Sequence, residues 1–349
     1  MNVIDPKDFM SVHKDMIVID GCSPLPGEDR NPKYFEWYLQ GGVTAVAPTV
    51  AEGAMQAETD SVHKDQVLDV LGYFHRQIQT RDDVLLVRKA DDVYTAKKEG
   101  KLGIFLHLQG ASCVEYNLDL VNMYKGAGVG VIQLTYNVRN QFGNGILEPR
   151  DDGLSTFGIE LVKRLNEAKI IVDVAHTGPQ TSLDAVKHSS APVIISHANA
   201  RGALDNIRNA PDEVIKAVAK SGGFCGAVMY PAFVSKAPRP SLEDYIRHID
   251  YLVELVGIDH VAIGADYFSA QWGVMSDEDA QKIYERYLAV GAWTKEAYPP
   301  PPWVYPKGVE TPKTWFNLTG GLLKRGYSVE DVRKLLGGNW LRVMKAVWG

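Results

Sequence analysis

The chain has 349 residues, of which 45% are hydrophobic and 23% are charged, and its formal net charge is −6. This composition is ordinary for a globular protein, and the length suffices to bury a large core without disulfide or metal staples. The acidic balance argues against nucleic acid as a partner, because a nucleic-acid-binding surface needs clustered basic residues.

The cysteine pattern and the terminal sequences bear on the cellular location. Cys22, Cys113 and Cys225 are widely spaced and odd in number, which is not typical of a disulfide framework, so we expect a reducing, cytoplasmic location. The first residues show no basic stretch followed by an apolar one, as a secretion signal would. No run approaches the ~18 apolar residues that a membrane span requires, so we expect no membrane partner.

Short apolar runs rich in β-branched residues recur along the chain and predict eight strands. They lie at about residues 16–20, 43–49, 103–108, 130–135, 170–175, 192–197, 223–229 and 260–265. The runs are continuous rather than alternating, which is typical of parallel strands that are buried on both faces. A further run at 84–87 is a candidate for a ninth strand outside the main set.

Amphipathic stretches between these runs predict helices, most clearly over 155–168, 211–220 and 242–256. Strands that alternate with helices predict either a closed barrel or a doubly wound sheet. No GxGxxG turn follows the first strand, which argues against a dinucleotide-binding sheet. We therefore predict an α/β fold, a single (β/α)8 TIM barrel domain over 1–349. Residues 328–347 predict two short C-terminal helices, broken at Gly337 and Gly338.

The segment 269–316 interrupts the alternation after the last predicted strand. It holds four consecutive prolines at 299–302, several aromatic residues and few periodic runs. A long irregular insertion at this point is typically a lid over the site or an oligomer contact. A surface insertion without a chemical role is the alternative.

Polar residues follow the predicted strands at the end where barrel enzymes build their sites. His176 and His197 follow consecutive strands, close enough for both imidazoles to bind one metal ion. Zinc binds imidazole nitrogen and accepts a carboxylate as a further ligand. Asp266, after the last strand, could supply that carboxylate or act as the general base on a water molecule. His107 lies within a strand, and its direction stays undecided.

These residues also carry a family resemblance. The stretches 172–176, 191–197 and 207–212, followed by 264–266 and 338–343, resemble the membrane (renal) dipeptidase family of the amidohydrolase superfamily. The resemblance extends over roughly residues 16–347. It implies a barrel with a pair of zinc ions, a dipeptide substrate and a homodimer.

The sequence departs from that family at the first metal position. Cys22 and Pro24 stand where the family has the His-x-Asp pair, Gln109 where it has a bridging glutamate, and Tyr136 where it has a further histidine. A bacterial side branch of the family resembles this chain in lacking the same ligands. Proline offers no ligand, and a neutral glutamine cannot offset two dications, so we expect the first site to be absent. The positions that match the family are His176, His197, Arg208, Tyr230 and Asp266.

We therefore predict a hydrolase of a dipeptide or small carboxylated amide that uses one divalent metal ion, zinc in the first place. His176 and His197 hold the ion, with help from Asp266 and the carbonyl oxygen of Gln109. For Cys22 two interpretations stay open. Its thiolate is a further ligand, or it is a small buried residue that replaces a lost one.

The remaining site residues are expected to act on the substrate. Asp266 deprotonates the attacking water, and Tyr136 donates a hydrogen bond to the developing oxyanion. Arg208 binds a substrate carboxylate through its planar fork, with a surface salt bridge as the alternative, and Tyr230 lines the pocket or packs in the core.

Two other functions remain open on the same barrel. A metal-free paralogue would bind carboxylated ligands through Arg208 without turning them over. A lyase or isomerase would use Asp266 as base and Tyr136 as acid.

Overall fold

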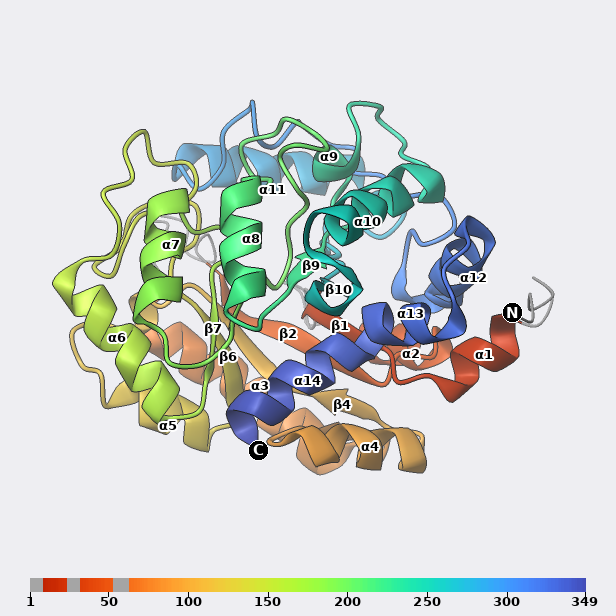
Figure 1. Cartoon of the computed structure of the whole chain (residues 1–349), viewed down its shortest axis with the longest axis horizontal. Helices are drawn as coiled ribbons and strands as arrows, with labels where there is room; N and C mark the ends of the chain where they lie inside the picture. Colours follow the sequence, from red (N-terminus) through yellow and green to blue (C-terminus); the bar gives the residue numbers. More distant parts are fainter. Residues whose placement is uncertain (1–8, 24–31, 53–62) are drawn as a thin grey trace.

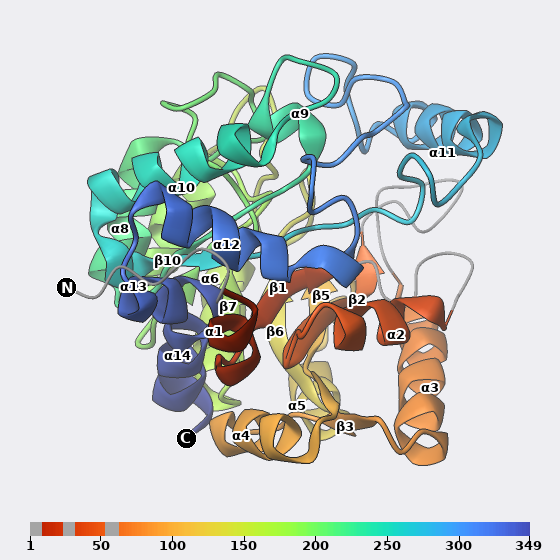
Figure 2. The ribbon, with the colours of Figure 1, turned by 90° about the vertical axis from the view of Figure 1, so that its right-hand side faces the viewer.

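The computed structural model describes residues 9–23, 32–52 and 63–349. Its strands surround a central axis, with helices packed outside them (Figures 1 and 2). The strands are β1 (Ile19–Ser23), β2 (Ala45–Glu52), β3 (Val84–Leu86), β4 (Leu102–Ile104), β5 (Leu106–Gln109), β6 (Val129–Gln133), β7 (Ile171–Asp173), β8 (Val193–Ile194), β9 (Cys225–Ala227) and β10 (Val261–Ile263). The helices are α1 (Phe9–Asp15), α2 (Lys33–Gln40), α3 (Lys64–Thr80), α4 (Ala90–Glu99), α5 (Leu120–Gly126), α6 (Thr156–Glu167), α7 (Pro179–His188), α8 (Asp212–Lys220), α9 (Pro231–Val234), α10 (Leu242–Val256), α11 (Asp277–Ala289), α12 (Phe316–Arg325), α13 (Val329–Arg333) and α14 (Asn339–Trp348).

The strands close into a parallel barrel, as predicted. Strand β1 pairs with β2, and the order continues through β5, β6, β7 and β8, while β9 pairs with β10. A parallel bridge between Ile195 and Cys225 joins β8 to β9. The amide of Asp266 donates to the carbonyl oxygen of Cys22 at 3.0 Å, which brings the end of β10 back to β1.

The predicted strand at 103–108 is interrupted at Phe105, which separates β4 from β5. Strand β4 pairs with both β2 and β3, so the run at 84–87 is confirmed as an additional strand beside the barrel. Phe105 packs against Trp340 of α14 with ring centroids 5.3 Å apart. Phe105 and other large side chains pack against α14 and close the amino-terminal end of the barrel. Only the carboxyl-terminal end is therefore available for a site.

The helices begin and end close to their predicted bounds, because local capping fixes them. The hydroxyl of Ser155 accepts from the amide of Gly158 at the start of α6, and α10 spans the predicted residues 242–256. The predicted break at Gly337 and Gly338 is wrong: residues 334–338 form a π-helical turn that joins α13 to α14. A Cβ atom on Gly337 would lie 2.4 Å from the carbonyl oxygen of Ile17, so glycine serves close packing here.

The insertion after β10 contains α11, a helix that its weak hydrophobic pattern did not predict. Ser276 caps this helix, and three acidic residues occupy its first turn. Helices α9 and α11 lie at one end of the barrel, opposite α4 and α14 (Figures 1 and 2). Across the described ranges, no helix combines the length and apolar character that crossing a membrane would demand.

Candidate active site

The predicted site residues gather at the carboxyl end of the barrel. His176 follows β7, His197 follows β8 and Asp266 follows β10. The backbones of His176 and Asp266 are in the left-handed region, with φ of 59° and 54°. Non-glycine residues rarely adopt this conformation, which costs on the order of 1–3 kcal/mol and concentrates at functional sites.

The two histidines face each other through their Nε2 atoms, which lie 2.9 Å apart. Both side chains are buried, at 4% and 0% exposure. Burial lowers the pKa of each well below its usual range, and the nearby positive charge of Arg208 lowers it further. Both imidazoles are therefore neutral at physiological pH, and a charged imidazolium does not account for the short contact.

The partners of the Nδ1 atoms decide where the protons lie. Asn137 Oδ1 is 2.7 Å from His176 Nδ1 and can only accept, so that nitrogen carries the proton. Ser196 Oγ donates to Asp173 Oδ2 and lies 2.7 Å from His197 Nδ1, so it accepts from that ring. Both Nε2 atoms then present lone pairs to each other. Two such acceptors at 2.9 Å cannot hydrogen-bond, whereas a cation beside them would be bound by both.

A second group of potential ligands adjoins the pair. One ligand atom each from Cys22, His197 and Asp266 lies within 4.8 Å of the others. Ligands of one tetrahedral zinc ion are separated by roughly 3.3–3.8 Å, given Zn–N and Zn–S bonds of ~2.0–2.3 Å. The donor set therefore suits one divalent ion after small side-chain shifts. His176 is not one of these three residues, but its Nε2 lies 2.9 Å from Nε2 of His197, which is.

The charges of this group also suit a single dication. Burial raises the pKa of Asp266 to about 6, while Arg208 opposes the shift. Burial, with Asp266 as a further cause, raises the pKa of the Cys22 thiol well above its usual range. A bound metal ion reverses this preference, because a coordinating thiol is deprotonated. Asp266 and a Cys22 thiolate would then together balance two positive charges.

Gln109 contacts this group with its amide nitrogen rather than its carbonyl oxygen. Its Nε2 lies 3.1 Å from Cys22 Sγ and 2.7 Å from Thr49 Oγ1. The thiol in turn donates to Asp266 Oδ1 at 3.4 Å, which leaves the sulfur as the acceptor for Gln109. The sequence predicted that the carbonyl oxygen of Gln109 would help to bind the ion. In the structure the amide nitrogen faces Cys22 instead and orients its sulfur.

Arg208 and Tyr230, the two predicted substrate-binding residues, are buried, and each has one polar atom without a hydrogen bond within the described part of the chain. Among the described residues, neither Arg208 Nε nor the Tyr230 hydroxyl has a hydrogen-bond partner. The guanidinium is 2% exposed, donates through Nη2 to the carbonyl oxygen of His197 at 3.1 Å, and lies over the ring of Phe233. The alternative of a surface salt bridge for Arg208 is therefore wrong. A buried cation of this kind favours an anionic partner.

The site is covered by residues 290–305, which we call the covering segment. A cavity of about 20 Å³ remains beneath it, with Asp266, Tyr136, Tyr230 and Trp293 among its lining residues. One water molecule needs ~10–15 Å³, so this space admits water or an ion but no dipeptide. Tyr136 stacks on His176 at 4.2 Å, and its hydroxyl accepts from Trp293 Nε1 at 3.4 Å.

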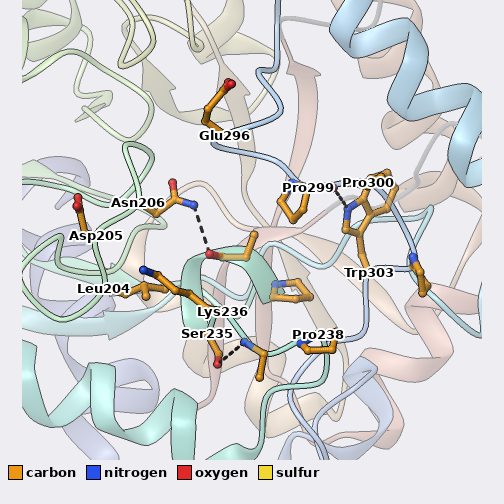
Figure 3. Close-up of a pocket in the computed structure, with 14 residues that line it drawn as sticks. Leu204, Asp205, Asn206, Ser235, Lys236, Pro238, Glu296, Pro299, Pro300 and Trp303 are labelled. Atoms are coloured by element: carbon orange, nitrogen blue, oxygen red, sulfur yellow. Dashed lines mark hydrogen bonds between the residues drawn. The ribbon is translucent and has the colours of Figure 1, made fainter.

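A wider groove of about 410 Å³ lies on the outer side of the covering segment. Figure 3 shows Lys236 and Ser235 near its middle, with Asp205 and Trp303 on opposite sides. Exposed prolines of the covering segment and of the loop after α9 form much of its wall. The Trp303 ring separates the groove from the aromatic residues of the site, as it packs 6.4 Å from Tyr230.

Sequence reasoning missed the residues that hold the histidines in place. Asp173 accepts from the amides of Ala175 and Ser196, from the Ser196 hydroxyl and from His107 Nε2. His107 thus points into the barrel, as do Phe105 and Gln109 two residues to either side. That two-residue alternation was the available signal, because successive side chains of a strand face opposite sides.

A closed parallel barrel with paired histidines and an aspartate at its strand ends defines the chain as an amidohydrolase-type hydrolase. A crystal structure of an amidohydrolase from Pseudomonas aeruginosa is 33% identical and superposes with a TM-score of 0.85, covering 98% of this chain and 99% of that one. A Rhodobacter sphaeroides metallopeptidase, solved with a phosphinate mimic of L-Ala-D-Ala, shares the fold at 19% identity and a TM-score of 0.78, over 96% and 100% of the chains.

The family is equally clear from the sequence comparison. The family "Membrane dipeptidase (Peptidase family M19)" matches residues 7–289 and 303–348, and the chain belongs to it. An uncharacterized dipeptidase of Schizosaccharomyces pombe is 31% identical over 208 residues, which are 58% of this chain and 50% of that protein. An uncharacterized Klebsiella pneumoniae protein is 28% identical over 75% of this chain and 89% of its own length. The predicted family and enzyme class are confirmed, and the matched ranges leave out residues 290–302, most of the covering segment.

Proposed function

We propose that the chain hydrolyses a dipeptide or a small carboxylated amide with the help of one divalent metal ion, zinc in the first place. The observation that carries this proposal is the pair of facing Nε2 lone pairs on His176 and His197. Cys22 and Asp266 beside them supply the negative charge that an ion needs. An ion bound there would polarise the scissile carbonyl and lower the pKa of a water molecule toward ~7.

The chain's own residues then divide the chemistry. Asp266, which follows β10 and lies beside Cys22 and His197, accepts the proton of the attacking water and delivers it to the leaving amine. The Tyr136 hydroxyl stabilises the oxyanion that develops on the carbonyl oxygen. The C–O bond to water forms first, and the amide C–N bond then breaks as the leaving nitrogen receives the proton from Asp266, so one water molecule is consumed in each turnover.

Arg208 and Tyr230 bind the substrate. The unpartnered Nε–H of Arg208 suits a carboxylate, and the Tyr230 hydroxyl suits a polar group of the substrate backbone. Removing the carboxylate from a substrate would leave a buried guanidinium unpaired, so recognition should be selective for carboxylated compounds.

We further propose that the covering segment is a lid. The cavity beneath it is about 20 Å³, so a dipeptide can enter only after this segment moves. The groove on its outer side is where a substrate would first be held. The homodimer and the cytoplasmic location stay predictions, which light scattering and fractionation of cells would test.

The direct test combines zinc-loaded protein with a panel of dipeptides and N-acyl amino acids in oxygen-18 water. Uptake of one heavy oxygen into the product carboxylate supports the hydrolase. Turnover without oxygen uptake would point to a lyase or isomerase. Saturable binding of carboxylated ligands without turnover, by protein that retains no zinc after incubation with it, would point to a metal-free binding protein.

A further inference from the structure

The two facing histidines are held by different parts of the fold. His197 is held by the barrel itself: its Nδ1 donates to Ser196 Oγ, which donates to Asp173 at 2.5 Å. Asp173 is the last residue of β7, Ser196 follows β8 by two residues, and all three side chains are fully buried. The tautomer and direction of this ring are therefore fixed as soon as the barrel forms.

His176 depends instead on the covering segment. Its Nδ1 donates to Asn137 Oδ1, and Asn137 Nδ2 donates to the carbonyl oxygen of Ala292 at 2.8 Å and to the Tyr298 hydroxyl at 3.0 Å. Ala292 is 155 residues from Asn137 in the sequence. Tyr298 itself stacks on Trp293 with ring centroids 4.3 Å apart, so both contacts of the Asn137 amide lie in one packed part of the covering segment.

The direction of the Asn137 amide controls the His176 lone pair. With the covering segment in place, Nδ2 must face the Ala292 carbonyl, because two acceptors would repel each other there. Without the segment, the amide can turn and present its N–H groups to His176 Nδ1. That nitrogen would then accept, the ring proton would move to Nε2, and the lone pair that faces His197 would be lost.

We propose that Asn137 is a positioning residue through which the covering segment sets the tautomer of His176. The inference rests on the proposed function for its consequence, since a His176 that carries its proton on Nε2 offers no lone pair to an ion between its ring and that of His197. Closing the covering segment thus places the lone pair on His176 Nε2. The lone pair on His197 Nε2 is already in place before the segment closes. Metal binding and substrate closure are coupled through a single amide.

The test measures the His176 tautomer directly, by nitrogen-15 NMR of histidine-labelled, metal-free protein. In the wild type, His176 Nδ1 should carry the proton. In Asn137→Ala, the proton should distribute between both ring nitrogens. In Asn137→Asp, Nδ1 should keep it, because a carboxylate can only accept. The same carboxylate repels the Ala292 carbonyl, so hydrogen exchange at residues 290–305 should accelerate in this variant.

Metal affinity gives the second measurement. Loss of a partner of a ligating histidine typically weakens binding 10- to 100-fold, so the zinc dissociation constant of Asn137→Ala should rise by about that factor. Tyr298→Phe removes one acceptor of the Asn137 amide without touching His176, and should cause a smaller rise. Ser196→Ala is the matched control: it should alter the His197 ring signals but leave hydrogen exchange at 290–305 unchanged.

Unchanged His176 ring signals in Asn137→Ala would overturn the proposal, as would a Ser196→Ala variant that loosens residues 290–305 as much as Asn137→Asp does. Because the tautomer is measured in metal-free protein, failure of the role of Asn137 can be distinguished from failure of the proposed function. A tautomer change in a protein that binds no zinc would support the role of Asn137 and reject the proposed metal hydrolase. Zinc binding with a tautomer insensitive to Asn137 would reject the role of Asn137 alone.

Discussion

His176 and His197 turn their Nε2 atoms toward each other at 2.9 Å, at the ends of neighbouring strands of a closed barrel. The partners of their Nδ1 atoms place a lone pair on each facing nitrogen. Neutral, buried imidazoles in this arrangement repel unless a cation accepts both lone pairs. The pair is therefore the centre from which the function of the chain is best tested.

We expect about one divalent ion per chain in protein purified without added zinc, measured by plasma mass spectrometry. His176→Ala and His197→Ala should each lose most of it, because each removes one of two converging nitrogen donors. His188→Ala, at the end of α7, is the matched control and should keep the ion. Two ions per chain in the wild type would contradict the one-metal site.

Cys22 should contribute a sulfur ligand. In cobalt-substituted protein, the wild type should show a near-ultraviolet sulfur-to-cobalt charge-transfer band that Cys22→Ser lacks, along with weaker metal retention. Cys225→Ser, a buried cysteine whose thiol donates to the Ala198 carbonyl oxygen, should keep the band. If Cys22→Ser retains both the band and the ion, Cys22 is only a small buried residue.

Arg208→Lys should raise KM for carboxylated substrates by about 10- to 100-fold, because it keeps the charge but loses the fork that pairs with a carboxylate. The corresponding loss of ~1.5–3 kcal/mol is that of a hydrogen bond to a charged group. Steady-state kinetics with a dipeptide and its C-terminal amide measure the effect. An equal change in KM for both compounds would show that Arg208 does not contact the carboxylate.

Tyr136→Phe should lower kcat by about 10²- to 10³-fold, the range measured when one oxyanion donor is removed. KM should change little, because the hydroxyl acts on charge that develops in the transition state. The variant should retain its metal ion, which separates this role from damage to the His176 ring on which Tyr136 stacks. An unchanged kcat would exclude Tyr136 from the chemistry.

Protonation of His13 in the unfolded chain should destabilise the protein in mild acid. Burial lowers the pKa of this side chain, which is 3% exposed and contacts the Gly41 carbonyl oxygen at 2.8 Å. As the pH falls through the unfolded pKa of ~6.5, the unfolded chain takes up a proton that the folded chain does not. The contribution of His13 to the free energy of unfolding therefore decreases below that pH.

His13→Gln should be less stable at pH 7.5, yet its slope of unfolding free energy against pH should be shallower by up to ~1.4 kcal/mol per pH unit. Urea unfolding at several pH values between 5 and 7.5 measures this slope. A His13→Gln slope equal to the wild type would show that His13 takes up its proton equally in both states.

The sequence determined the parts of this protein that depend on local spacing. Continuous apolar runs marked the buried parallel strands, and Ser155 together with the 242–256 pattern fixed helix bounds, because capping and amphipathic spacing act within a few residues. The same strand ends placed His176 beside His197, since the carboxyl ends of parallel strands meet at one end of a barrel.

Only the tertiary structure decided what depends on contacts between distant segments. The direction of Gln109, the burial of Arg208 and the bond from Asn137 to Ala292 each follow from packing that no local pattern encodes. Gly337 looked like a helix breaker but serves close approach to Ile17. Local propensity is a matter of tenths to about one kcal/mol per residue, so packing overrides it wherever distant segments meet.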